Sequence, residues 1–253
     1  MAAHILITGA SSGIGASLSI ELARRGYSVG VVARREPELI DLVEKIRAAG
    51  GTAEWATADV AEPETLVKAV AHLENQLGPV EVMVANAGIS GRNDTSAPDL
   101  SKIRRVMEVN FYGAIHSAQA VLPGMCERGQ GQLVVVSSVA GFRGLPKSSA
   151  YSSSKAAITT YWESQRVELA GRGILCTTVN PGYIKTPLTD KNNHPMPFIL
   201  SAEKAAKIMA DGILARRKVI TFPWRMKFVM ALMRVLPVWL YDRLMAKAGP
   251  NYR

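Results

Sequence analysis

Two side chains capable of proton chemistry, Tyr151 and Lys155, lie four positions apart where a segment with helical periodicity begins. This spacing places both on one face of a helix, about 6 Å apart along its axis. A free tyrosine has a pKa of about 10, and a nearby ammonium favours the phenolate. The pair therefore predicts a tyrosine that exchanges protons with an alcohol or a carbonyl, although the same spacing is common on helix surfaces without any chemical role.

Two serines, Ser137 and Ser138, end the apolar segment that precedes this helix. If that segment is a strand of a parallel sheet, their hydroxyls lie at its carboxyl edge, where one of them can hydrogen-bond a substrate oxygen. The serines and the tyrosine thus predict one site at the end of a strand.

A glycine-rich loop, with glycines at Gly9, Gly13 and Gly15, follows the first apolar segment and opens a helix. Glycine lets the backbone turn tightly and approach a pyrophosphate, which the free N–H groups and the positive end of the helix then face. The spacing departs from the G-x-G-x-x-G fingerprint. A tight turn without a ligand is the alternative.

The second predicted strand ends in Arg34 and Arg35, and no acidic residue precedes Glu36. An acidic side chain near this point binds the ribose 2′-hydroxyl of NAD, whereas a basic one accommodates the 2′-phosphate of NADP. A guanidinium binds phosphate through two charge-assisted hydrogen bonds. We therefore predict NADP(H) rather than NAD(H), selected by Arg34. The alternative is that the two arginines are only solvated basic side chains at a strand end, and this alternative has more weight for Arg35 than for Arg34.

The elements that must position these residues follow an alternating pattern of short apolar segments and longer helical ones, typical of βαβ units and a parallel sheet. We predict one α/β domain over residues 1–222, a Rossmann-type doubly wound parallel sheet of about seven strands, with a C-terminal extension, 223–253, that is not an independent domain. The expected strands are 4–8, 28–33, 52–57, 80–85, 132–137, 174–180 and 219–222, and the expected helices are 14–25, 37–49, 63–77, 101–127, 150–171 and 202–215. A Pro-rich loop over 187–200 is expected to be a lid or binding element.

Composition excludes several classes of protein. With 253 residues, 48% hydrophobic and 20% charged, the chain is neither disordered, collagenous nor a disulfide scaffold. Its two cysteines, Cys126 and Cys176, are expected to be reduced core residues of an intracellular protein. The first residues show no export signal, and the four histidines lack metal-ligand spacing, so no metal site is predicted.

The net charge of +9 is concentrated at the C-terminus. Residues 1–215 hold 21 Lys and Arg against 20 Asp and Glu, whereas residues 216–253 hold 9 against one. A nearly neutral body argues against a protein that binds nucleic acid. Basic and aromatic side chains in the extension predict two short amphipathic helices, broken at Pro237 and too short to span a bilayer. They either contact an anionic membrane surface or pack over the cleft or a partner subunit.

In combination, these motifs make the chain from Ile5 to at least Thr186 resemble the short-chain dehydrogenase/reductase family. The resemblance rests on order and spacing: Thr8-Gly9-x-x-x-Gly13-x-Gly15, Asn86-Ala87-Gly88, Ser138, Tyr151-x-x-x-Lys155 and Pro181-Gly182. It implies that Tyr151 is the general acid/base, that Ser138 orients the substrate oxygen, and that Lys155 lowers the tyrosine pKa and binds the nicotinamide ribose. It gives Asn110 a role in holding a water of a proton relay behind the lysine.

The resemblance also implies adenine contacts for Asp59 and Val60, a place beside the cofactor for Asn86, and carboxamide contacts for Ile184 and Thr186. With the glycine-rich loop, the expected cofactor-binding set is Gly9, Ser11, Ser12, Gly13, Ile14, Gly15, Arg34, Asp59, Val60, Asn86, Tyr151, Lys155, Pro181, Ile184 and Thr186.

The expected function is NADP(H)-dependent hydride transfer between nicotinamide and a carbonyl or secondary alcohol, with an apolar small molecule as substrate. The alternative is a catalytically silent NADP-binding sensor or scaffold on the same fold. The resemblance implies a homo-oligomer, either a dimer or a tetramer. The expected location is the cytoplasm, with possible peripheral attachment to a membrane through the extension.

Overall fold

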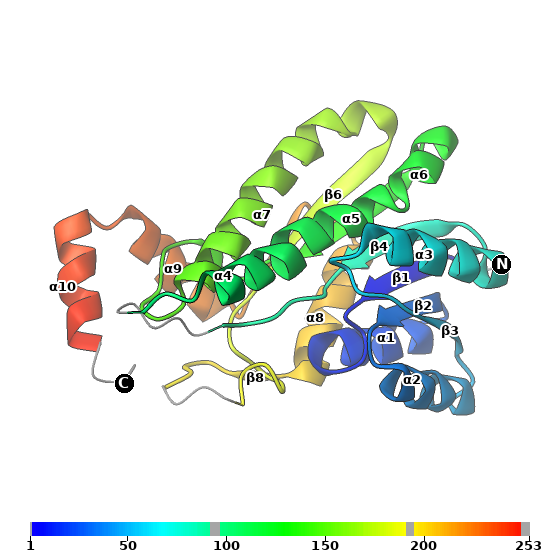
Figure 1. The fold of residues 1–253 in the computed structure, drawn as a ribbon, viewed down its shortest axis with the longest axis horizontal. Coiled ribbons are helices and arrows are strands. Elements are labelled where there is room, and N and C mark those ends of the chain that lie inside the picture. The colour runs from blue at the N-terminus through cyan, green and yellow to red at the C-terminus, as the bar shows by residue number, and fades with distance from the viewer. Residues whose placement is uncertain (1, 92–96, 191–194, 249–253) are drawn as a thin grey trace.

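Seven parallel strands form one sheet in the order β3-β2-β1-β4-β5-β6-β9 (Figure 1). This computed structural model describes residues 2–91, 97–190 and 195–248. Strands β1, β2 and β5 are buried along their whole length, because helices cover both faces of the sheet. The predicted Rossmann-type fold is confirmed. The strand bounds are β1 (His4–Thr8), β2 (Ser28–Ala33), β3 (Thr52–Thr57), β4 (Val80–Ala85), β5 (Gly131–Val136), β6 (Ile174–Pro181) and β9 (Val219–Phe222).

Two hydrophobic clusters, one on each face, hold the helices to the sheet. One cluster joins the sheet to α1 (Gly13–Arg24), α2 (Glu36–Ala48) and α8 (Ala202–Leu214). The other joins it to α3 (Pro63–Leu77), α5 (Gly113–Gln119), α6 (Leu122–Arg128) and α7 (Ser149–Glu168), and it includes Trp162 and Cys176, both fully buried. Cys176 and Cys126 are both unpaired thiols, as expected.

The prediction of one continuous helix over 101–127 is wrong. This segment consists of α4 (Leu100–Met107), a π-helical turn η1 (Glu108–Tyr112), then α5 and α6. Pro123 stands in the first turn of α6, where its missing N–H costs nothing, and so begins a new helix. The π-helical turn contains Asn110, in keeping with the frequent occurrence of such turns at functional sites.

A further difference concerns the last third of the chain. The predicted loop over 187–200 is flanked by two short strands that sequence periodicity did not reveal, β7 (Ile184–Lys185) and β8 (Leu200–Ser201), and its last residue belongs to β8. Residues 191–194 of that loop, including His194, lie outside the described part. The extension forms α9 (Trp224–Val235) and α10 (Val238–Ala248), which project from one end of the molecule (Figure 1). No helix among the described residues is long and apolar enough to cross a membrane.

Candidate active site

A cavity of about 510 Å³ opens at the carboxyl edge of the sheet, beside the point where β1 lies between β2 and β4. In doubly wound sheets the crevice at this switch of strand order is the ligand site. All the predicted site residues except Asn110 line this cavity. It therefore brings together the glycine-rich loop, the arginines after β2 and the Ser-Tyr-Lys group, which are far apart in the sequence.

Close backbone packing explains the glycines of the loop. Gly9 has a φ of 67°, and a Cβ there would lie 2.6 Å from Cα of Ala87. A Cβ on Gly15 would lie 2.5 Å from the carbonyl oxygen of Gly9. The Asn86 side chain braces the turn by donating hydrogen bonds to the carbonyl oxygens of Thr8 and Gly9, at 3.0 and 3.2 Å. The loop is thus held against the turn after β4 with its backbone exposed to the cavity.

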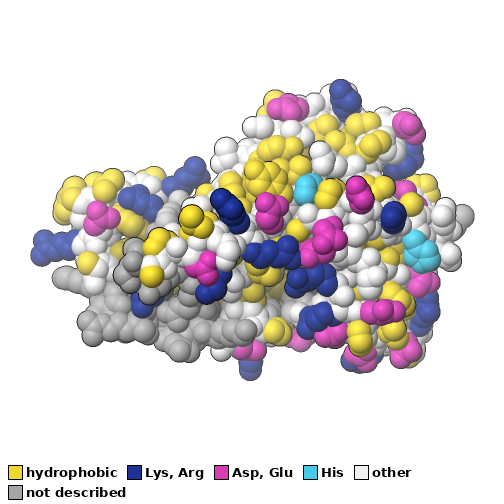
Figure 2. Space-filling model, viewed as in Figure 1, with side chains coloured by type: hydrophobic (Ala, Val, Ile, Leu, Met, Phe, Trp, Pro, Cys, Tyr) yellow, Lys and Arg dark blue, Asp and Glu magenta, His cyan; other side chains and the backbone are white. Residues whose placement is uncertain are grey.

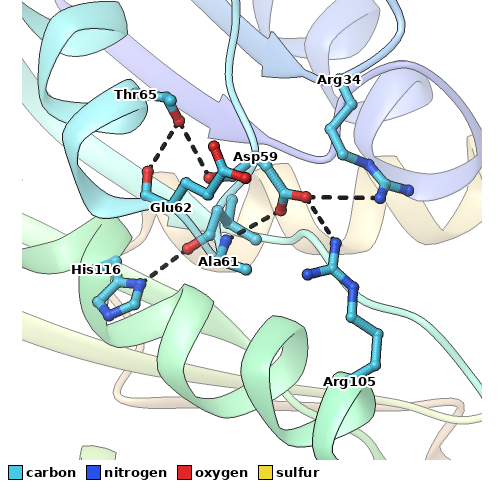
Figure 3. Close-up of polar contacts among 8 residues, drawn as sticks. Arg34, Asp59, Ala61, Glu62, Thr65, Arg105 and His116 are labelled. Atoms are coloured by element: carbon cyan, nitrogen blue, oxygen red, sulfur yellow. Dashed lines mark hydrogen bonds and ion pairs between the residues drawn. The ribbon is translucent and has the colours of Figure 1, made fainter. Parts of the chain in front are cut away.

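The two arginines after β2 both line the cavity, although they have different partners. Arg35 reaches back to the glycine-rich loop, where its Nη2 donates to Oγ of Ser11 at 2.8 Å and to Oγ of Ser12 at 3.0 Å. Arg34 lies instead beside Asp59, with 3.6 Å between its Nη1 and the nearer carboxylate oxygen (Figure 3). Sequence reasoning favoured Arg34 over Arg35; both line the cavity and are candidates for binding an anion.

Asp59 also accepts a hydrogen bond of 2.6 Å from Arg105, a residue of α4 that sequence reasoning missed (Figure 3). Burial alone would raise the pKa of the Asp59 carboxyl, but the Ala61 N–H and the two guanidiniums outweigh burial and hold that pKa below its ordinary value. Asp59 is therefore an anion at neutral pH. No motif connects positions 59 and 105, so only the fold reveals this pair.

A hydrogen bond joins the side chains of Tyr151 and Ser138, and both residues line the cavity. The Lys155 ammonium lies 5.7 Å from the centre of the tyrosine ring and donates to the carbonyl oxygen of Val136 at 2.8 Å. One helix, α7, supplies the tyrosine and the lysine, while the turn after β5 supplies the serine. This geometry confirms that the three residues lie together.

Burial governs the protonation of this group. It raises the pKa of Tyr151 above its ordinary value, and the hydrogen bond from Ser138 only partly offsets this. It lowers the pKa of Lys155 to about 8. We expected the ammonium to lower the tyrosine pKa, but in the protein alone desolvation is the larger effect. Tyr151 is a protonated phenol at neutral pH, a state that suits a proton donor.

The two serines after β5 differ in their hydrogen-bond partners. The Ser137 hydroxyl donates to the carbonyl oxygen of Lys155 at 2.8 Å and lies 2.7 Å from the Thr159 hydroxyl, so it fixes α7 to the sheet. The Ser138 hydroxyl accepts from the Ala140 N–H at 3.1 Å and contacts Tyr151. Both serines line the cavity, but the Ser137 hydroxyl is engaged with α7, so Ser138 is the better candidate to act on a ligand.

Asn110 has a supporting position. Its side-chain oxygen accepts from the Ile89 N–H at 2.8 Å, and its amide donates to the Ile89 carbonyl at 2.9 Å and to the Ser154 hydroxyl at 3.0 Å. These bonds tie the π-helical turn to the segment after β4 and to α7. The part in a proton relay that the resemblance implied remains a prediction. No group of His, Cys, Asp or Glu among the described residues could hold a metal ion.

This fold and cavity define a class of protein, the oxidoreductases that bind a nicotinamide dinucleotide at the switch point of a parallel sheet. The family model described as short chain dehydrogenase matches residues 3–197, and the chain belongs to that family. An uncharacterized oxidoreductase of Myxococcus xanthus is 40% identical over 237 residues, covering 94% of both chains. The 11-beta-hydroxysteroid dehydrogenase 1A of Arabidopsis thaliana is 32% identical, covering 87% of this chain and 68% of that protein. The structure of an actinorhodin polyketide ketoreductase variant with NADPH has a TM-score of 0.79 and 28% identity, covering 87% of this chain and 95% of its own.

Proposed function

We propose that the protein is an NADP(H)-dependent oxidoreductase that reduces the carbonyl group of an apolar small molecule. The observation that carries this proposal is the placement of Ser138, Tyr151 and Lys155 in the same cavity as Arg34 and Arg35. The first three supply proton chemistry and the last two a site for phosphate. The family supports nicotinamide-dependent oxidation and reduction in general.

The cofactor end of the cavity suits a dinucleotide with a 2′-phosphate. Gly9, Gly13 and Gly15 line the cavity at the start of α1, where the free N–H groups and the positive end of the helix suit a pyrophosphate. Arg34 and Arg35 present two guanidiniums at the end of β2, where NAD-specific enzymes carry an acid. The solved relative with NADPH agrees with this assignment.

The chain's own residues handle the proton. When bound, NADPH supplies the hydride for the carbonyl carbon. Ser138 would hold the carbonyl oxygen by a hydrogen bond, and Tyr151, protonated at neutral pH, would give its proton to the alkoxide that develops there. Lys155 would bind the nicotinamide ribose and place a positive charge beside the phenolate that remains.

A hydrophobic cluster next to Ser138, formed by residues outside the cavity lining, supports an apolar substrate. The next residue, Val139, packs with Met226 and Met230 of α9, and Phe142 and Tyr183 lie against this cluster. Methionine side chains adapt to irregular apolar shapes, which suits a pocket for a bulky hydrocarbon. The plant relative is named for action on a steroid, a substrate of that kind.

The cofactor assignment is tested with Arg34→Ala and Arg35→Ala, by measuring KM for NADPH and NADH. We expect KM for NADPH to rise about tenfold or more in each variant, the loss of a charge-assisted contact, while KM for NADH changes little. An unchanged KM for NADPH in both variants would remove these arginines from cofactor selection.

The rival proposal is a silent NADP-binding sensor or scaffold on this fold. Such a protein needs the phosphate site but not the proton-transfer group. The hydrogen bond between Tyr151 and Ser138, with Lys155 beside it, favours an enzyme. NADPH binding without oxidation across a panel of ketones, steroids, long-chain ketones and sugars would favour the sensor.

For the C-terminal extension we propose contact with an anionic membrane surface. On α9, Met226 and Met230 face the body, while the opposite side exposes Trp224, Phe228 and Val235, at 65%, 68% and 76%. Basic side chains flank this outward apolar face, and Figure 2 shows hydrophobic and basic groups together at the projecting end. A helix with outward aromatics and flanking cations suits the headgroup region of an anionic bilayer.

The same face of a second copy of the chain is a less suitable partner for this surface than a membrane, because two strongly basic surfaces would repel each other. Co-sedimentation with vesicles of phosphatidylserine and phosphatidylcholine tests whether the extension binds a membrane. We expect wild type to pellet with these vesicles, Phe228→Ala/Trp239→Ala to pellet less, and Val67→Ala, an exposed apolar residue of α3, to behave as wild type. Wild type that remains in the supernatant at low salt would exclude the membrane.

We also propose a cytoplasmic homo-oligomer, a dimer or tetramer, joined through α7 and the helices before it. Exposed apolar side chains on this side, Tyr112 and Val167, support an interface there. Light scattering after size exclusion measures the assembly directly; a monomer at micromolar concentration would contradict it.

A further inference from the structure

The Asp59 carboxylate at the rim of the cofactor cavity has two competing arginine partners, one on each side (Figure 3). Its Oδ2 atom lies 2.6 Å from Nη2 of Arg105 and 3.6 Å from Nη1 of Arg34. The shorter contact has hydrogen-bond length, whereas the longer one is a loose ion pair. Asp59 is therefore committed to Arg105, and Arg34 is only weakly held.

This division matters because a carboxylate beside Arg34 is a rival to any phosphate. Arg34 is well exposed and lines the cavity together with Asp59. A carboxylate without another partner would pair with Arg34 and would also repel a phosphate placed nearby. A short hydrogen bond from a second guanidinium satisfies the carboxylate and offsets its charge.

Arg105 itself is set back from the ligand. It belongs to α4 and is not among the residues that line the cavity, whereas Asp59 and Arg34 are. Its guanidinium binds the same Oδ2 atom of Asp59 that Arg34 approaches. Any influence of Arg105 on the cofactor must therefore pass through Asp59.

We propose that Arg105 is a positioning residue for cofactor selection: by pairing with Asp59 it leaves the Arg34 guanidinium available to a 2′-phosphate. This inference rests on the proposed use of NADP(H). It assigns a selective role to a residue on the helix after β4, far in sequence from the arginines that follow β2.

Arg105 lies on α4, and α5, which follows it after the π-helical turn, is fixed to the turn after β3 by contacts that do not involve Arg105. Nδ1 of His116 lies 2.9 Å from the carbonyl oxygen of Val60, the residue after Asp59. A Cβ on Gly113 would lie 2.6 Å from the Val60 side chain, which shows how closely α5 packs on the same turn. Loss of the Arg105 side chain leaves these contacts intact.

The test is the ratio of dissociation constants for NADH and NADPH, measured on the whole protein by ligand fluorescence. We expect Arg105→Ala to weaken NADPH binding about tenfold, with NADH changed less than about twofold, because Asp59 then pairs with Arg34. Arg105→Lys should recover part of the loss. Arg104→Ala, an exposed neighbour on the same helix, should leave the ratio unchanged.

A double variant separates action through Asp59 from direct phosphate binding. In Asp59→Asn/Arg105→Ala the rival carboxylate is absent, so we expect the wild-type ratio to return. A double variant that stays as unselective as Arg105→Ala would overturn the proposal, as would an unchanged ratio in Arg105→Ala. If wild type itself shows no preference for NADPH, or if Arg34→Ala keeps that preference, the proposed cofactor assignment fails first.

Discussion

The Lys155 ammonium donates a hydrogen bond of 2.8 Å to the carbonyl oxygen of Val136, inside the protein and beside the ring of Tyr151. Val136 is the last residue of β5, so this bond ties α7 to the carboxyl edge of the sheet at the point where Ser138 follows. Because burial disfavours the charged form, the pKa of Lys155 is lowered to about 8. The lysine is thus poised to change its charge just above neutral pH.

This pKa predicts a pH dependence. As pH rises through about 8, Lys155 loses its proton and with it the charge that binds the ribose and supports the phenolate. We expect kcat/KM for NADPH in the reductive direction to fall above that pH. Tyr151 does not produce this fall, because its pKa lies above the ordinary tyrosine value. A profile that stays flat from pH 7 to pH 10 would contradict the assignment.

Gly9→Ala tests the tight approach of the glycine-rich loop to the turn after β4. The variant adds a Cβ 2.6 Å from Cα of Ala87 at a φ of 67°. We expect a loss of about 2 kcal/mol or more in the free energy of unfolding, since strain and a backbone clash add, and a weaker affinity for NADPH. Gly26→Ala is the matched control: its φ is 86°, but no atom lies within 4 Å of the added Cβ.

In the control we expect only the strain of about 1 to 2 kcal/mol, with NADPH affinity unchanged. Urea denaturation and ligand titration measure both quantities. Equal effects of the two variants on NADPH affinity would mean that the approach of Gly9 to Ala87 has no bearing on the cofactor.

Arg143→Ala tests how the C-terminal extension is attached. The Arg143 guanidinium donates to the carbonyl oxygens of Met233, Arg234 and Leu236, at 3.0 to 3.1 Å, and lies 4.3 Å from the centre of the Tyr241 ring. It therefore satisfies the carbonyls at the end of α9 and holds α10 as well. Its removal should reduce the local stability of both helices by about 1 to 3 kcal/mol.

Hydrogen exchange measures this directly. Amides of α9 and α10 should exchange faster in Arg143→Ala, those of α1 at the wild-type rate, and NADPH affinity should stay within about twofold. Lys147→Ala, an exposed substitution in the same connection, should change neither region. Unaltered exchange in α9 of the Arg143 variant would show that Met226 and Met230 suffice to hold the extension.

Local spacing predicted the parts of the site that lie on one element. Tyr151 and Lys155 share a helix face because helical geometry requires it, and the glycines mark a backbone turn that other residues cannot adopt. The strands were found because residues covered on both faces are almost all apolar. The division of the extension at Pro237 followed from the same local chemistry, since proline removes a donor and fixes its backbone.

Contacts between distant segments could not be predicted in this way. Arg105 contacts Asp59 only because α4 packs over the turn after β3. The sequence pattern of neither segment predicts this contact. The contacts of Arg35 with Ser11 and Ser12 could not be predicted, because the return of its side chain depends on the shape of the loop. The π-helical turn at Asn110 was missed because helical periodicity carries no signal for it, and the Asn110 side chain's bonds to Ile89 and Ser154 form only in the folded chain.

The central claim is that Tyr151 gives the proton in an NADPH-dependent reduction. Its most direct test follows NADPH absorbance with a panel of apolar ketones for wild type, Tyr151→Phe and Tyr161→Phe, a second tyrosine of α7. We expect turnover in wild type and Tyr161→Phe, and a loss of about 100-fold or more in Tyr151→Phe with NADPH affinity largely kept. Near-normal turnover by Tyr151→Phe would contradict the account.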